Sequence, residues 1–169
     1  MGPAEFVNEK RLQKDFDSLK ELSKDPDGGI TRLAYTETET KAHEYVAFEA
    51  KKIGLAATTD AIGNLYVKLG GGNEKIIRIG SHLDSVNNGG NYDGAVGVLT
   101  SLEALRCLVE AKAGLKHPAD YGIPTGMIFV PSKNGISHSP EEYTDLRYIS
   151  MAARVLIAAI IEAQNTWGD

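Results

Sequence analysis

Histidines and aspartates at the ends of expected strands are the residues of this chain best suited to bind a metal ion. An apolar segment over residues 75–81 runs directly into His82, and Asp84 follows two residues later. Residues two apart along a strand share a face, so the imidazole and the carboxylate should lie together. Such a pair is either a metal ligand with the group that orients it or a local ion pair.

Asp93 is the next candidate, because the chain between it and His82 can fold back. Gly89 and Gly90 lie between the two residues, and glycine allows a close turn without Cβ clashes. Asp93 also precedes Gly94 at the start of an expected helix. It is therefore either a metal ligand or only the cap of that helix, in which case His82 is an ordinary polar residue at a strand end.

His138 follows a second expected strand, Met127 to Val130, within the segment PSKNGISHSPEE. Ligands of open α/β sheets gather at the carboxyl ends of the strands, so we expect His138 to approach His82 and Asp93. Two imidazoles and one carboxylate suit zinc or a similar divalent ion. The sequence therefore predicts a metal site built from these three side chains.

The residues directly after His138 have a simpler interpretation. Ser139, Pro140, Glu141 and Glu142 are typical of a helix N-terminus, with serine as the cap, proline in the first turn and acids favoured by the helix dipole. The alternative is a catalytic role for one of the two glutamates.

The elements that must position these residues alternate between helices and strands. Hydrophobic spacing and turn residues predict helices over residues 5–23, 37–53, 95–111 and 141–164, a hairpin over 57–61 and 64–69, and core strands over 75–81 and 127–130. This order predicts one α/β domain over residues 1–169, with three α/β/α layers around a small, mostly parallel sheet.

Composition excludes several classes of protein. The 169 residues carry a formal net charge of −5, which argues against a nucleic-acid binder. The longest apolar run, residues 155–161, is far too short to span a membrane. Cys107 is the one cysteine; it excludes an internal disulfide and lies on an apolar helix, where we expect it to pack in the core. A cytoplasmic protein is expected.

Three motifs resemble the hydantoinase/carbamoylase family of metal-dependent amidohydrolases. They are GGITRLAYTETE from Gly28, GSHLDSVNNGGNYDGAVGV from Gly80 and GIPTGMIFVPSKNGISHSPEEYT from Gly122. The resemblance implies a zinc-peptidase-like catalytic domain that hydrolyses a C–N bond of N-carbamoyl amino acids or ureido acids. Related metallo-exopeptidases are an alternative that fits these motifs less well.

The resemblance also implies roles for the candidate residues. His82 would bind one metal ion, Asp93 would bridge two, and His138 would bind the second. Asp84 would support His82 without touching the metal. Zinc is the expected metal, with manganese, cobalt and nickel as alternatives.

The chain departs from the family between its third helix and the strand at 127–130. Family members carry there a further strand with adjacent glutamates, one a general base and one a metal ligand, then another histidine ligand and a lid domain that forms the dimer. Here residues 116–122 replace that segment. The departure predicts a monomer with a small-molecule substrate and reduced activity, or a non-catalytic remnant that keeps the fold and one metal site.

Overall fold

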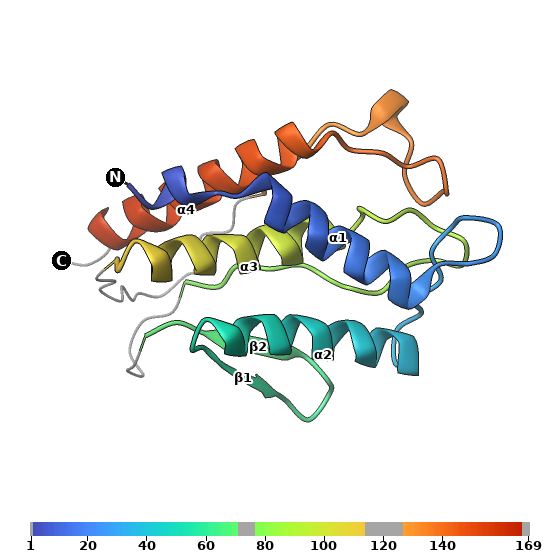
Figure 1. Cartoon of the computed structure of the whole chain (residues 1–169), viewed down its shortest axis with the longest axis horizontal. Coiled ribbons are helices and arrows are strands. Elements are labelled where there is room, and N and C mark those ends of the chain that lie inside the picture. The colour runs from blue at the N-terminus through green and yellow to red at the C-terminus, as the bar shows by residue number, and fades with distance from the viewer. Residues whose placement is uncertain (1, 71–76, 114–126, 167–169) are drawn as a thin grey trace.

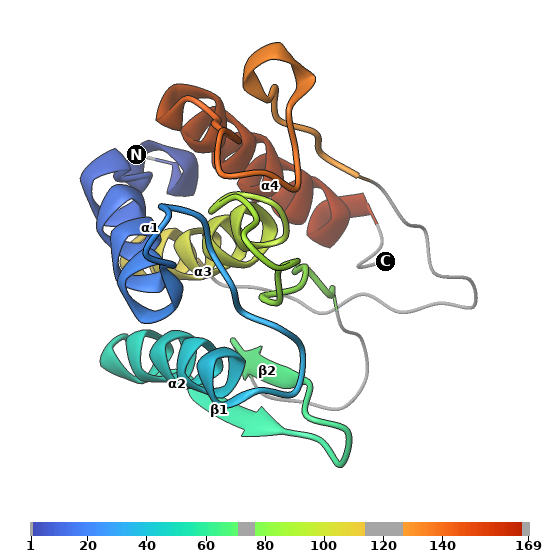
Figure 2. The ribbon, with the colours of Figure 1, turned by 90° about the vertical axis from the view of Figure 1, so that its right-hand side faces the viewer.

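Helix α3 (Ala95–Glu110) lies at the centre of the molecule. In the computed structural model, which describes residues 2–70, 77–113 and 127–166, α1 (Glu9–Ser23) and α4 (Leu146–Thr166) pack beside α3. Helix α2 (Glu37–Lys52) packs on α1 and on a hairpin of β1 (Ala56–Thr59) and β2 (Leu65–Lys68) (Figures 1 and 2). Single 3-10 turns cover Pro3–Phe6 and Lys133–Gly135. No helix of these described ranges is long and apolar enough to cross a membrane.

The first three predicted helices and the hairpin are confirmed. Leu12, Phe16 and Leu19 of α1 are fully buried, as their spacing along one helix face predicts. Thr36 caps α2, since its hydroxyl accepts a hydrogen bond from the backbone N–H of Glu39. Strands β1 and β2 pair antiparallel, as the two strands of a hairpin do.

The predicted parallel strands do not form in the part of the chain that the structure describes. Its sheet is the β1–β2 pair, and neither residues 77–81 nor residues 127–130 adopt a strand. Ile77 and Ile79 still pack on the core, but Met127 and Phe129 are 79% and 82% exposed. A strand needs a neighbour to accept its backbone hydrogen bonds, and apolar side chains alone do not supply one. The connector at 116–122 lies outside the described residues.

Helix α4 begins five residues later than predicted. The backbone N–H of Glu142 bonds to the Ser139 carbonyl in an isolated turn, and the helix starts at Leu146. The side chain of Asp145 accepts from the N–H of Arg147 at 2.9 Å, as a residue just before a helix does. The interpretation of Ser139 as the cap is wrong, because the chain turns away before it becomes helical.

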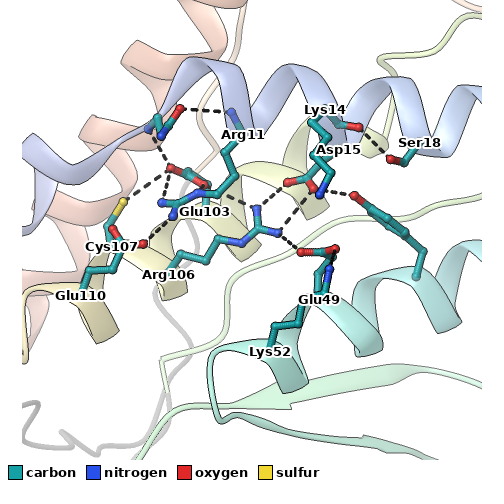
Figure 3. A network of polar contacts seen from close by, with 12 residues as sticks. Arg11, Lys14, Asp15, Ser18, Glu49, Lys52, Glu103, Arg106, Cys107 and Glu110 are labelled. Carbon is teal, nitrogen blue, oxygen red and sulfur yellow. Dashed lines mark hydrogen bonds and ion pairs between the residues drawn. The ribbon is translucent and has the colours of Figure 1, made fainter.

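A buried network of charges joins α1, α2 and α3 (Figure 3). The guanidinium of Arg106 lies 2.5 Å from Asp15 and 2.9 Å from Glu49, and Glu103 lies 3.5 Å away on the same helix. Arg11 closes the network on its other side with an ion pair of 2.8 Å to Glu103. Buried charges are tolerated only when partners satisfy them, and here each carboxylate has at least one cation.

Cys107 provides a direct test of this core. It is fully buried, and burial, with the charge of Glu103 adding to it, raises the pKa of its thiol to about 12. Because the thiolate is the reactive form, we expect almost no reaction with a disulfide reagent at neutral pH in the native protein, and rapid reaction in guanidinium chloride. The reaction can be measured by the absorbance of the released thiol. Rapid labelling of Cys107 in native buffer would contradict this packing.

Candidate functional site

The predicted site residues lie together where the chain enters α3 and approaches α4. Nε2 of His82 is 3.6 Å from Oδ2 of Asp93, and Nε2 of His138 is 3.3 Å from the same oxygen. The three side chains are 44–62% exposed, so solvent and small molecules can reach them. Figure 1 shows the two loops that carry them at one end of the molecule, where α3 and α4 begin.

Asp84 holds the other side of the His82 ring. Its carboxylate Oδ1 lies 3.1 Å from Nδ1 of His82, and its backbone carbonyl oxygen lies 3.2 Å from the same nitrogen. Both partners are acceptors, so they favour the tautomer in which Nδ1 carries the proton. Nε2 then keeps its lone pair and faces Asp93, which is the arrangement a metal-ligating histidine needs.

The distance from each histidine Nε2 to Oδ2 of Asp93 is close to the distance between two ligands of one metal ion. Ligands about 2.0–2.1 Å from a tetrahedral zinc ion lie about 3.3 Å from one another, close to the separations of the His82–Asp93 and His138–Asp93 pairs. Within the described ranges, however, no three His, Cys, Asp or Glu side chains form a closed group ready to hold one ion. The arrangement is therefore two imidazole–carboxylate pairs that share one oxygen of Asp93.

Gly94 allows His82 to lie against the start of α3. It adopts a φ of +67°, and a Cβ there would come within 2.5 Å of Cε1 and Nδ1 of the His82 ring. Any side chain at this position would displace the imidazole. The N-terminus of α3 also favours the negative charge of Asp93 beside it.

Arg32 is a positioning residue that the sequence interpretation did not identify. Arg32 is fully buried, and its Nε donates a hydrogen bond to the carbonyl oxygen of Leu83. Its backbone N–H donates to the hydroxyl of Ser85, and its backbone carbonyl accepts from the N–H of Ser85. Burial lowers the pKa of its guanidinium, while the nearby charge of Asp84 opposes this shift. Arg32 thus fixes the backbone on both sides of Asp84. Its position in the motif GGITRLAYTETE is the only sequence signal for it.

Glu142 is the second residue whose role was missed. The sequence assigns it to a helix N-terminus, but its carboxylate lies 2.8 Å from the backbone nitrogens of Tyr92 and Asp93. It is 7% exposed, whereas the neighbouring Glu141 is exposed and bonds to Ser139. The two adjacent glutamates therefore have different environments, and local capping patterns do not distinguish them.

Several known proteins are similar to this chain. The model of Peptidase family M28 matches residues 64–145, which contain all four site residues. An N-carbamoyl-L-amino acid amidohydrolase of Geobacillus stearothermophilus is 38% identical over 117 residues. A crystal structure of a hydantoinase/carbamoylase family amidase from Burkholderia ambifaria matches with a TM-score of 0.60 and 30% identity over 66% of this chain. Over the matched segments the chain is similar to amidohydrolases of the hydantoinase/carbamoylase family.

The match of this chain to these proteins is partial in length. It covers 68% of the chain and 29% of the Geobacillus protein, and 28% of the Burkholderia chain. An allantoate amidohydrolase of Bacillus subtilis is 42% identical over 94 residues, which are 54% of this chain and 23% of that protein. The chain thus spans less than a third of these relatives, and the structural match confirms the predicted α/β class.

Proposed function

We propose that this chain binds a divalent metal ion through His82, Asp93 and His138 and hydrolyses a C–N bond of N-carbamoyl amino acids or ureido acids. One observation supports this most: Nε2 of both histidines faces the same oxygen of Asp93 in a chain that is similar to amidohydrolases. Zinc is the metal whose ligand preferences this donor set fits best.

Each residue has a distinct task in this proposal. A bound divalent ion would polarise the carbonyl of the substrate and lower the pKa of a bound water. His82 and His138 supply neutral nitrogen ligands, and Asp93 supplies the negative charge between them. Asp84 keeps the proton of His82 on Nδ1. The partial exposure of these groups leaves room for a small acidic substrate.

Hydrolysis also requires a general base that accepts a proton from the attacking water. Among the residues that the structure describes, Asp84 and Asp93 each contact an imidazole, and the carboxylate of Glu142 already accepts hydrogen bonds on both oxygens. None of these carboxylates is free to act as a general base. The absence of such a base typically costs about 100- to 10,000-fold in rate, so we expect metal binding to be easier to detect than turnover.

The same observation supports a second candidate, a non-catalytic domain that binds metal. Two measurements separate the candidates. Calorimetric titration with Zn²⁺ tests the metal site, which both candidates require. Ammonia release from N-carbamoyl amino acids with Zn²⁺, Mn²⁺ or Co²⁺ tests hydrolysis, and dipeptides assayed in parallel test the exopeptidase alternative.

We expect Zn²⁺ to bind and carbamoyl substrates to be hydrolysed slowly. In His82→Ala, hydrolysis should be lost and Zn²⁺ binding strongly weakened. Zn²⁺ binding without any hydrolysis that depends on His82 would favour the non-catalytic candidate. A folded protein that binds no divalent ion would rule out both.

A further inference from the structure

Glu142 connects the two loops of the candidate site. Its Oε1 accepts hydrogen bonds of 2.8 Å from the backbone N–H groups of Tyr92 and Asp93. Its Oε2 accepts hydrogen bonds of 3.1 Å from the hydroxyl of Ser137 and from the backbone N–H of His138. One carboxylate thus holds the backbone of both Asp93 and His138, which are 45 positions apart in the sequence.

The burial of Glu142 contrasts with the exposure of the residues it holds. Its exposed fraction is 7%, while the side chains of Asp93 and His138 are 44% and 62% exposed. Within the described ranges no ion pair joins Glu142, so its charge is stabilised by hydrogen-bond donors. A buried carboxylate without a cation is tolerated only when such donors satisfy it, which ties its stability to the position of both loops.

The backbone around this carboxylate is adapted to it. A Cβ on Gly90 would lie 2.4 Å from Cβ and Cδ of Glu142, so glycine is needed for the segments that contain Gly90 and Glu142 to lie this close. His138 has a φ of +58°, a conformation that non-glycine residues rarely adopt. The hydrogen bond from its N–H to Glu142 helps to hold this conformation and directs the imidazole toward Asp93.

We propose that Glu142 is a positioning residue that sets Asp93 and His138 at the separation needed to bind a metal ion. The proposal rests on the proposed function in one respect, because it takes these two side chains as ligands. Glu142 acts through backbone groups and does not touch the metal. Groups that orient metal ligands typically contribute about 10- to 100-fold to metal affinity.

The neighbouring Glu141 supplies a matched control. It has the same side chain, but it is exposed and bonds only locally to Ser139. Glu142→Gln keeps the size of the side chain and replaces one oxygen by an amide that cannot accept a hydrogen bond. At least one pair of donors then loses its acceptor. Glu141→Gln changes the net charge by the same amount without affecting those donors.

The experiment combines Zn²⁺ titration with amide NMR of the metal-free protein. For Glu142→Gln we expect Zn²⁺ affinity to fall about 10-fold or more, and the amide resonances of Tyr92, Asp93 and His138 to shift upfield. The visible spectrum of bound Co²⁺ should change as its ligands move. Glu141→Gln should keep the affinity, the three resonances and the Co²⁺ spectrum of the unmodified chain.

Each outcome decides the matter. Unchanged affinity and unmoved Asp93 and His138 amides in folded Glu142→Gln would overturn the proposal. If Glu142→Gln does not fold, Ser137→Ala removes one donor and keeps the carboxylate; a several-fold loss of affinity then supports the proposal, and no loss overturns it. If the unmodified chain binds no Zn²⁺, the proposed function fails, and the amide shifts alone decide whether Glu142 positions the two loops.

Discussion

Asp93→Ala is expected to abolish Zn²⁺ binding, and to do so more completely than either histidine substitution. Asp93 Oδ2 is the atom that both imidazoles face, whereas His82 and His138 each belong to one of the two contacts. Four-ligand zinc sites contribute about 10–16 kcal/mol, or roughly 3 kcal/mol per ligand. Since 1.4 kcal/mol is tenfold in affinity, we expect His82→Ala or His138→Ala to weaken binding by more than about 100-fold.

Calorimetric titration with Zn²⁺, and thermal unfolding with and without Zn²⁺, measure how much affinity each of these variants loses. A ligand that binds only the folded chain raises its unfolding temperature, so the unmodified protein should be stabilised by Zn²⁺ and Asp93→Ala should not. Asp84→Ala should keep binding but lose about 10- to 100-fold, because it only orients His82. Asp27→Ala, at an exposed position, controls for net charge. Retention of full affinity by Asp93→Ala would contradict the assignment of the shared ligand.

The sequence predicts the proximity of His82, Asp93 and His138 better than it predicts the sheet. His82, Asp93 and His138 were identified because imidazole and carboxylate groups follow apolar segments in recognisable motifs, and the structure brings these side chains together. The segments themselves, 75–81 and 127–130, are predicted as strands from their apolar character. Side-chain character indicates burial on a sheet, but pairing depends on neighbouring strands elsewhere in the chain.

Long-range hydrogen bonds explain the errors near α4. A Ser-Pro-Glu-Glu segment is favourable at a helix start, but the donors that hold Glu142 include Tyr92 and Asp93, far away in the sequence. Local rules cannot include donors whose position depends on the tertiary fold. The buried charge network, in contrast, does have a local signal in the sequence. Asp15 lies on the apolar helix face defined by Leu12, Phe16 and Leu19. A charge on such a face is a signal that could have predicted a buried partner.

Arg106→Met is expected to destabilise the fold by about 3–5 kcal/mol, the usual cost of removing one member of a buried ion pair. Methionine fills much of the same volume, so the loss reports charge more than packing. Asp15 and Glu103 are fully buried and Glu49 nearly so, and all three lie within 3.5 Å of the Arg106 guanidinium. For a chain of this size the unfolding temperature should fall by on the order of 10 °C.

The control is Arg147→Met, which removes an ion pair of 2.7 Å with Asp145 at the exposed start of α4. Exposed pairs contribute little, so this variant should unfold close to the unmodified chain. The double variant Arg106→Met with Asp15→Asn should lose less stability than the sum of the single variants. Glu103 keeps its ion pair with Arg11 and Glu49 keeps its ion pair with Lys52, so the second substitution removes the carboxylate whose ion pair Arg106→Met breaks. Additive losses would show that the Arg106–Asp15 pair is not coupled.

The pH dependence separates lost charge from lost packing. Without Arg106, the desolvation of Glu49 is less opposed, so its pKa should rise from the lowered value that it has in the unmodified chain. A carboxyl group whose folded pKa lies below its unfolded value contributes stability at neutral pH that is lost as the pH falls, and a smaller lowering means a smaller contribution. In the unmodified chain burial raises the pKa of Glu49, but Lys52 and Arg106 outweigh it and the net shift is downward. The stability deficit of Arg106→Met should therefore be largest at neutral pH and shrink as the pH falls through the carboxyl range. A deficit that stays constant over this range in denaturant titrations would assign the loss to packing instead.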